Sequence, residues 1–304
     1  MAPAQHTGPQ HPGPQYPGRQ CGEPRPAPAA GPPGGGWPEG TLLAELRRDG
    51  SPAALAAERA VLRLGTRRAH GHGETLILDR DLGGFVLLLL TGFAKATVED
   101  TGGAPALLDI RAYGDVVGEA AALDDRPRSA TVTAAGPVTL RRISQADWLH
   151  WLGGHAAAGL ALSRCLVHRG RVTTRRLVGL VSEPVVHRLA HHLADLAGRY
   201  GTAGPRGAGL TVRPRLTQAE LAALVGAGER RVHHALHELA GHGLIRLGRR
   251  RTTVLSLPGL LAVAAGAEPG TGPDGPERDP DGPGADRPRR GLSGPGARPP
   301  AARP

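Results

Sequence analysis

The residues best suited to bind a small ligand lie between Gly118 and Val132. Glu119 follows Gly118, a run of small residues comes next, and Arg128 and Ser129 stand nine and ten positions after the acid. A cyclic nucleotide needs a guanidinium and free backbone N–H groups for its phosphodiester, and an acceptor carboxylate for its ribose hydroxyl. The spacing therefore predicts a cyclic nucleotide site. The alternative is a structural ion pair that closes a β-hairpin, and in an empty site we expect Glu119 and Arg128 to pair with each other.

A second set of residues, between Leu216 and Leu255, suits a nucleic acid. Thr217, with Glu220 three residues later, forms a capping-box pattern that predicts the start of a helix. The sequence Gly226-Ala227-Gly228 predicts a tight turn. Apolar residues then recur on one face of a second helix: Val232, Ala235, Leu236 and Leu239. Two short helices joined by a glycine turn are typical of a helix-turn-helix.

Two strand-like runs, Leu244–Leu247 and Thr252–Leu257, flank three consecutive arginines. They predict a hairpin, or wing, whose basic tip meets the phosphate backbone, where contact needs charge and little shape. The alternative is a solvated basic turn. Arginine in the major groove reads guanine, and glutamate can accept a hydrogen bond from cytosine. The residues predicted to contact DNA are Thr217, Gln218, Glu229, Arg230, Arg231, His233, His234, Arg249, Arg250 and Arg251.

Short β-rich runs must position the ligand site. Gly and Asp punctuate them at intervals of about ten residues, which predicts a compact antiparallel β-roll or barrel. The runs are Thr75–Leu78, Phe85–Leu90, Ala94–Val98, Leu107–Arg111, Ala130–Thr133 and Val138–Arg142.

A long helical pattern follows, from Ala156 to Val181. Its members recur at steps of four and three, close to a heptad seam: Leu162, Leu166, Gly170, Thr173, Leu177 and Leu180. The helix could pack on its own sheet or on a second copy of itself, and we favour the second copy. Glu183-Pro184 breaks the pattern, because the residue before a proline disfavours α geometry. We expect the hinge between two domains there.

The two ends of the 304-residue chain differ from its middle. Residues 1–40 contain 11 Pro and 9 Gly, and residues 266–304 contain 10 Pro and 9 Gly, so we expect two disordered tails. Both ends are balanced in charge, and the net charge of +10 therefore falls in residues 41–265. The predicted division is a β-roll over 41–155, a dimerisation helix over 156–182 and a winged helix-turn-helix over 183–265. A basic segment of this kind favours an anionic partner, usually nucleic acid.

Several classes of protein are excluded by composition. Cys21 and Cys165 are too few for a disulfide framework, a four-thiolate zinc site or a four-cysteine iron–sulfur cluster. The proline-rich start is unlike a signal peptide, and the longest apolar run is too short to cross a bilayer, so we expect a soluble cytoplasmic protein. No nucleophile–base set, P-loop or dinucleotide turn indicates an enzyme. The histidines on the predicted helices lack a third ligand, so no metal site is predicted.

The combined order of these parts resembles the cyclic-AMP receptor protein/FNR (Crp/Fnr) family of bacterial transcription regulators, over residues 41–265. The resemblance implies an α+β fold with an N-terminal cyclic-nucleotide-binding β-roll, a long dimerisation helix and a C-terminal winged helix-turn-helix. It implies that Glu119 holds the ribose hydroxyl, that Arg128 binds the phosphate and that Thr173 and Thr174 lie near the base at the dimer seam. The implied ligand set is Gly118, Glu119, Ala120, Arg128, Ser129, Thr173 and Thr174.

The sequence also departs from the family pattern. The reading helix of the family often has Ser-Arg-Glu-Thr-Val and an arginine two residues later, whereas this chain has Gly228-Glu229-Arg230-Arg231-Val232-His233-His234. The order of acid and base is reversed, which predicts a different DNA sequence. Asp81 and Leu82 stand where a Gly-Asp pair is common, and the few cysteines argue against the family's iron–sulfur oxygen sensors.

We therefore expect a homodimeric regulator that binds double-stranded DNA, with RNA polymerase as a further candidate partner. No cofactor is required, and cyclic AMP (cAMP) or cyclic GMP (cGMP) is the candidate effector. The alternative is a constitutive, ligand-independent DNA binder that uses the roll only as a dimerisation scaffold.

Overall fold

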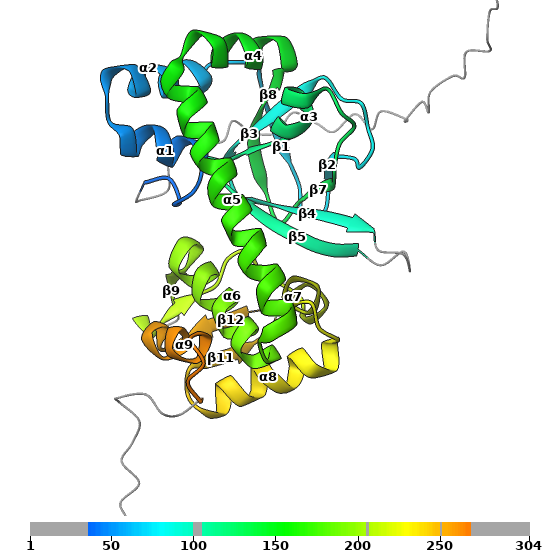
Figure 1. Ribbon diagram of the computed structural model, residues 1–304, viewed down its shortest axis with the longest axis vertical. Helices are drawn as coiled ribbons and strands as arrows, with labels where there is room; N and C mark the ends of the chain where they lie inside the picture. Colours follow the sequence, from blue (N-terminus) through cyan, green and yellow to red (C-terminus); the bar gives the residue numbers. More distant parts are fainter. Residues whose placement is uncertain (1–35, 100–104, 205–206, 250, 269–304) are drawn as a thin grey trace, which may run out of the picture.

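The computed structural model describes residues 36–99, 105–204, 207–249 and 251–268. A long helix, α5 (Ala156–Ser182), runs the length of the molecule and joins a β-roll to a smaller C-terminal lobe (Figure 1). The predicted disordered tails lie largely outside the described residues. Trp37, which we placed in the first tail, is instead buried, because its ring packs beside Tyr113 and its indole N–H donates to Glu58. The folded region therefore begins before residue 41.

Two four-stranded antiparallel sheets form the β-roll, in the orders β1-β8-β3-β6 and β2-β7-β4-β5. All six predicted strands are confirmed. Two further strands were missed: β1 is an exposed edge strand without apolar alternation, and β6 is only two residues long. The strands are β1 (Thr66–His70), β2 (Thr75–Ile77), β3 (Phe85–Thr91), β4 (Phe93–Glu99), β5 (Pro105–Ala112), β6 (Val116–Val117), β7 (Thr131–Ala134) and β8 (Val138–Ser144).

Strand β3 is buried on both faces. Its side chains point alternately to the two faces, so that successive residues belong to two different hydrophobic cores. Leu87 and Leu89 face the interior of the roll with Ile77 and Leu140. Val86, Leu88 and Leu90 face a cluster formed with the helices. Those helices are α1 (Leu42–Asp49), α2 (Pro52–Val61), α4 (Gln145–Gly154) and the first half of α5. The short α3 (Glu119–Asp124) lies within the segment Gly118–Val132, which we call the cassette.

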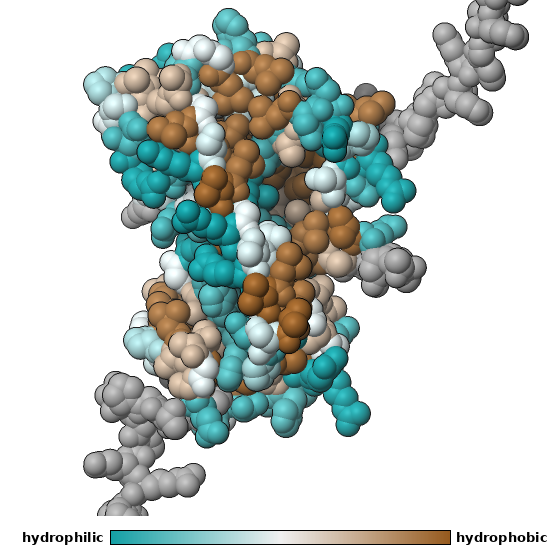
Figure 2. All heavy atoms as spheres, viewed as in Figure 1, coloured by the Kyte–Doolittle hydropathy of each residue, from teal (hydrophilic) through white to brown (hydrophobic). Residues whose placement is uncertain are grey.

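Helix α5 buries one face and exposes the other. Leu162 packs in the helix-covered core with Cys165, so its predicted place in the exposed seam is wrong. The other apolar members of the seam, Leu166, Leu177 and Leu180, are exposed, and a brown apolar band follows α5 down the molecule (Figure 2). The predicted break at Glu183-Pro184 is confirmed, because α5 ends at Ser182 and the next helix begins at Val185.

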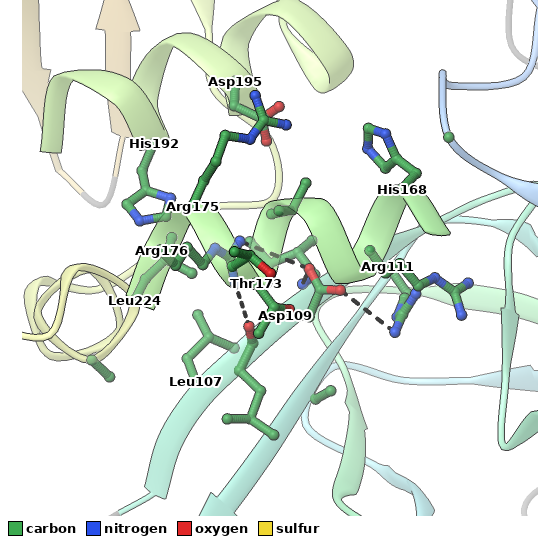
Figure 3. A pocket seen from close by; sticks show the side chains of 18 of the residues that line it. Leu107, Asp109, Arg111, His168, Thr173, Arg175, Arg176, His192, Asp195 and Leu224 are labelled. Atoms are coloured by element: carbon green, nitrogen blue, oxygen red, sulfur yellow. Dashed lines mark hydrogen bonds and ion pairs between the residues drawn. The ribbon is translucent and has the colours of Figure 1, made fainter. Parts of the chain in front are cut away.

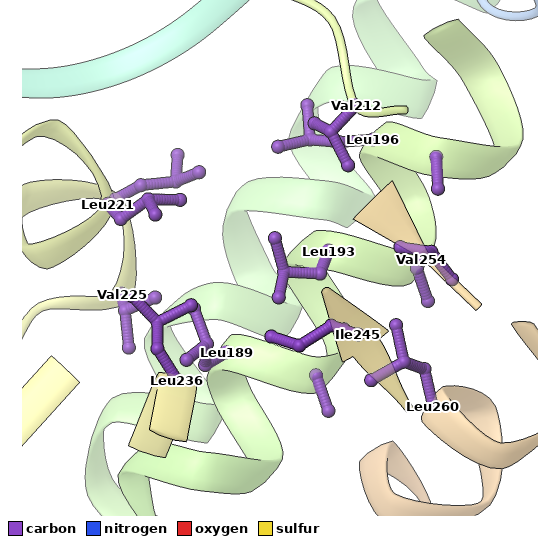
Figure 4. Close-up of a cluster of buried hydrophobic side chains, with 14 of the residues drawn as sticks. Leu189, Leu193, Leu196, Val212, Leu221, Val225, Leu236, Ile245, Val254 and Leu260 are labelled. Carbon is purple, nitrogen blue, oxygen red and sulfur yellow. The ribbon is translucent and has the colours of Figure 1, made fainter. Parts of the chain in front are cut away.

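Within its described residues, the C-terminal lobe contains four α-helices and a small sheet of order β11-β12-β10-β9. The capping box of Thr217 and Glu220 is confirmed at the start of the first short helix, and Gly226 ends that helix with a φ of 65°. Leucine, valine and isoleucine side chains from the helices and the sheet of the lobe fill its core (Figure 4). The elements are α6 (Val185–Tyr200), α7 (Gln218–Val225), α8 (Glu229–Gly241), α9 (Leu257–Ala264), β9 (Thr202–Ala203), β10 (Leu210–Thr211), β11 (Ile245–Gly248) and β12 (Arg251–Val254).

The β-roll and the C-terminal lobe share a hydrophobic core. Leu107 and Ile110 of β5 belong to the same buried cluster as Leu221 of α7. Phe93 of β4 packs edge-on against Tyr200 of α6, with ring centroids 5.5 Å apart. The two lobes therefore meet through the β4–β5 hairpin as well as through α5.

Candidate effector cavity and DNA interface

A cavity of about 930 Å³ lies between the β-roll, α5 and the C-terminal lobe. The roll contributes its floor, including Ile77, Ala96 and Val132. Segments that are far apart in the sequence meet at this cavity, and they include every residue of the predicted ligand set: Gly118, Glu119, Ala120, Arg128, Ser129, Thr173 and Thr174.

Arg128 is buried against the cavity and held by backbone oxygens. Its guanidinium donates to the carbonyl of Gly118 at 2.6 Å and to those of Gly83 and Phe85 at 2.9 and 2.5 Å. The Nε of Arg128 has no hydrogen-bond partner within the described part of the chain. Burial lowers the pKa of this guanidinium. A buried cation with a spare donor suits an anionic ligand.

Gly118 has to be a glycine in this arrangement. Its φ is 82°, which L side chains rarely adopt, and a Cβ there would lie 2.5 Å from Nη1 of Arg128. The residue is also the N-cap of α3 and makes no side-chain cap bond. The backbone of Gly118 therefore approaches the guanidinium closely.

The expected pairing of Glu119 with Arg128 is wrong. Glu119 instead accepts a charge-assisted hydrogen bond from Arg169 of α5, and Arg169 also donates to Asp115 at 2.7 Å. All three side chains are nearly buried. Burial disfavours the charge on Arg169, but Asp115 and then Glu119 outweigh it and raise the pKa of the guanidinium. A buried, paired cation therefore connects the cassette to the long helix.

Helix α5 forms the wall of the cavity opposite the roll. Figure 3 shows Asp109 and Arg111 of β5 facing Thr173 and Arg176 of α5. Arg176 donates to the carbonyl of Leu108 at 2.5 Å. Burial alone would raise the pKa of Asp109, but Arg111 and then Arg176 lower it overall. The wall is therefore lined by ionised groups of both signs.

Helix α8 presents the predicted reading residues on one exposed face. Val232 and Leu236 are buried against the lobe, whereas the polar residues Glu229, Arg230, Arg231, His233 and His234 are exposed. The ring of His233 lies 3.1 Å from Nε2 of Gln218 and stacks obliquely near His237. The two helices of the motif are therefore fixed to each other at their outer surface.

The N-terminus of α7 and the wing complete this surface. The Thr217 hydroxyl accepts from the backbone N–H of Glu220 at 3.2 Å, which leaves its O–H free to donate. Strands β11 and β12 form the predicted hairpin, with Arg249 and Arg251 exposed at its end. Arg250 lies outside the described residues. A hollow of about 540 Å³ between the start of α6 and α8 is lined by Arg230, Arg231 and histidines.

No group of three or more metal-ligating side chains occurs within the ranges that the structure describes. None of the described helices is long and apolar enough to cross a membrane.

Two domain families match the chain. Residues 67–154 match the cyclic nucleotide-binding domain, and residues 187–263 match the Crp-like helix-turn-helix domain. The chain is 31% identical over 175 residues to a CRP-like cAMP-activated global transcriptional regulator of Mycobacterium tuberculosis, and the match covers 58% of this chain and 77% of the relative. The chain belongs to the Crp/Fnr family.

A further relative and a solved structure extend the comparison. The cyclic AMP receptor protein of Thermus thermophilus is 28% identical over 221 residues, covering 71% of this chain and 98% of that protein. The solved structure of FixK2 from Bradyrhizobium japonicum has the same fold, with a TM-score of 0.57 at 17% identity over 67% of this chain and 99% of that one. This Crp/Fnr chain is thus a DNA-binding transcription regulator, and the family is one of transcription factors rather than enzymes.

Sequence reasoning missed several residues of the cavity. Arg169, Asp115 and Arg176 line it, although none stood out by local spacing. One signal was present: Arg169 precedes Thr173 by four residues, which places both on one face of a helix. The partners of Arg169 on the roll could not be inferred without the crossing of α5 over the cassette.

Proposed function

We propose that a cyclic mononucleotide, cAMP or cGMP, binds in the cavity and gates DNA binding by this Crp/Fnr regulator. The observation that carries the proposal is the buried Arg128, which lines the cavity with Glu119: its Nη1 donates to the carbonyl of Gly118, and its Nε has no partner among the described residues. Arg128 would bind the cyclic phosphate and Glu119 the ribose hydroxyl. Ser129 would add a contact to the phosphate, and Thr173 would lie near the base.

Arg169 supports a route from the ligand to the long helix. It belongs to α5 and holds the carboxylate that would receive the ribose. A nucleotide that bonds Glu119 must share that carboxylate with Arg169 or displace it. Either result changes the contacts between α5 and the roll, so the ligand can favour one position of α5, which is the requirement for gating.

The exposed apolar face of α5 supports a homodimer. Leu177 is 60% exposed and Val181 91% exposed, on a helix whose other face is buried. An unpaired apolar stripe at near-heptad spacing suits a second copy of the same helix. We expect Leu177→Asp to convert a dimer to a monomer in sedimentation velocity, whereas an unchanged mass would contradict this interface.

We propose that the exposed face of α8 reads the major groove, while Thr217, Gln218 and the wing contact phosphates. The exposed positions of Glu229 and Arg230 support an operator that differs from the family's usual one. Selection of bound DNA from a random pool, with and without cAMP, identifies the operator. It also shows whether the nucleotide changes affinity, sequence preference or both. We propose that the protein binds DNA in the cytoplasm. RNA polymerase is a candidate partner.

Isothermal titration of the full chain with cAMP and cGMP tests the effector. Arg128→Ala is a poor probe, because it also removes three hydrogen bonds within the roll. Glu119→Gln keeps the side-chain size, and we expect it to weaken binding by about tenfold. Glu39→Gln, at an exposed acid, is the matched control. No heat and no change in operator affinity at millimolar nucleotide would overturn the proposal.

One observation favours the constitutive alternative. The charged side chains of the cassette already have polar partners within the chain, because Glu119 pairs with Arg169 and three carbonyls accept from Arg128. A site whose side chains have their hydrogen-bond partners within the chain can be stable without a ligand. In that case DNA affinity would be the same with and without nucleotide, and Glu119→Gln would leave it unchanged.

A further inference from the structure

Lys95 is the only lysine in the chain, which has 37 Lys and Arg residues in total. Arginine fills every other basic position, so the composition itself singles this side chain out. Lys95 lies on β4 and is nearly buried, and its ammonium donates to the carboxylate of Glu220 on α7. A compact ammonium on a flexible stem suits a narrow, partly buried site better than a planar guanidinium does.

Strand β4 faces the effector cavity on one side and the C-terminal lobe on the other. Ala94 and Ala96 point into the roll, and Ala96 lines the cavity. Phe93 and Lys95 point the other way, to Tyr200 of α6 and to α7. The alternation of side chains along a strand produces this division. Neighbouring residues of one strand therefore contact the cavity and the lobe that carries the reading helix.

Glu220 has two separate roles. One oxygen, Oε2, accepts the backbone N–H of Thr217 at 2.8 Å and so completes the capping box of α7. The other oxygen, Oε1, accepts from Lys95. The capping role needs only an acceptor oxygen, which glutamine also supplies. The contact with Lys95 needs the negative charge.

We propose that the Lys95–Glu220 ion pair is a latch that positions α7, and with it the reading helix α8, for DNA binding. In the arrangement that it holds, the polar face of α8 is exposed. The second part of the proposal rests on the proposed function: a nucleotide in the cavity contacts its floor at Ala96 and tightens the latch through β4. Lys95 is a positioning residue that does not itself contact the nucleotide.

Lys95→Met and Glu220→Gln test the first part in the full-length protein. Methionine keeps the apolar stem of Lys95, and glutamine keeps the capping box. We expect each variant to weaken operator binding by about tenfold in fluorescence anisotropy, and the double variant to be no weaker than either single one. Arg59→Met, which removes an exposed cation from α2, controls for the loss of one positive charge.

The two variants also separate the latch from simple electrostatics. Loss of a positive charge weakens attraction to phosphates, but loss of a negative charge strengthens it. Simple electrostatics therefore predicts opposite effects for Lys95→Met and Glu220→Gln, whereas the latch predicts the same effect. Opposite effects, no effect, or losses that multiply in the double variant would overturn the proposal.

The unique lysine also gives a direct measure of the latch. An amine-selective reagent labels only Lys95 and the α-amine, and mass spectrometry of the two peptides makes the α-amine an internal reference. We expect Lys95 to label slowly in the native protein, more slowly with cAMP, and several-fold faster in Glu220→Gln. Labelling of Lys95 at the rate of the unfolded chain would refute the latch.

The two proposals can fail independently. If cAMP gives no heat and no change in labelling, the proposed gating fails, but the ion pair must still support DNA binding. If cAMP binds and stimulates DNA binding equally in native protein and in Lys95→Met, the nucleotide acts through another route. That result overturns the coupling role of β4 and leaves the effector site intact.

Discussion

His192 gives this regulator a stability that depends on pH in a predictable direction. The side chain lies on α6, is 7% exposed and lines the cavity. Burial lowers its pKa to about 3, helped by Arg176, His191 and Arg188 and opposed by Asp109. The folded protein therefore keeps His192 neutral where an unfolded histidine, with a pKa of about 6.5, takes up a proton.

The direction and size of the pH effect on stability follow from this difference between the folded and unfolded pKa of His192. Because the folded pKa is the lower one, the contribution of neutral His192 is complete above about pH 6.5 and is lost as the pH falls toward 3. The loss grows by about 1.4 kcal/mol for each pH unit below 6.5. Between pH 7.5 and pH 5.5 it therefore reaches about 1.4 kcal/mol.

Urea unfolding of the native protein and of His192→Gln, each at pH 7.5 and pH 5.5, measures this loss. Any packing that glutamine disturbs changes the free energy of unfolding equally at the two pH values. This change cancels when the pH-dependent loss of the variant is subtracted from that of the native protein. The other titrating groups cancel in the same way. We expect the native protein to lose about 1.4 kcal/mol more than the variant on acidification. Equal losses would mean that His192 takes up its proton in the folded state, and would refute the reasoning.

Three further changes test the site. Arg169→Gln should lower the free energy of unfolding by about 3 kcal/mol, because two buried carboxylates lose their cation; a loss below about 1 kcal/mol in calorimetry would contradict this pairing. Gly118→Ala should abolish the heat of cAMP binding by displacing Arg128, whereas Gly136→Ala, where a Cβ meets nothing within 4 Å, should bind normally. Thr217→Val should cost about 1 kcal/mol of stability through loss of the cap and should weaken operator binding; unchanged unfolding would argue against the cap.

Short sequence patterns correctly predicted those helices and strands that carry a strong signal within their own residues. The strand Phe85–Thr91 is a continuous apolar run, and α7 begins at a capping box, so both could be placed from the sequence. The helices Leu42–Asp49 and Pro52–Val61 were missed because they are short and follow a proline-rich tail. Their apolar faces are covered by α5, a partner that comes more than a hundred residues later. Tertiary packing, rather than local propensity, decides such helices.

The same division applies to the effector cavity. Gly118, Glu119 and Arg128 lie within one short stretch, so the chemistry of their spacing was visible. The prediction that Glu119 pairs with Arg128 was wrong. Sequence spacing brings Glu119 near Arg128, but Arg169 approaches from α5, fifty positions away, and takes the carboxylate. Backbone carbonyls then satisfy most of Arg128, and no side-chain pattern can reveal such acceptors.

Glu220 shows how one residue can be read correctly and still incompletely. Its distance of three residues from Thr217 predicted the capping box, and that pattern accounts for an acceptor oxygen at this position. Its second contact lies 125 positions away, where β4 turns Lys95 toward α7. The two roles differ in what they require, since the cap needs an oxygen and the ion pair needs a charge. Glutamine at position 220 therefore separates what the local sequence specifies from what the packed domains add.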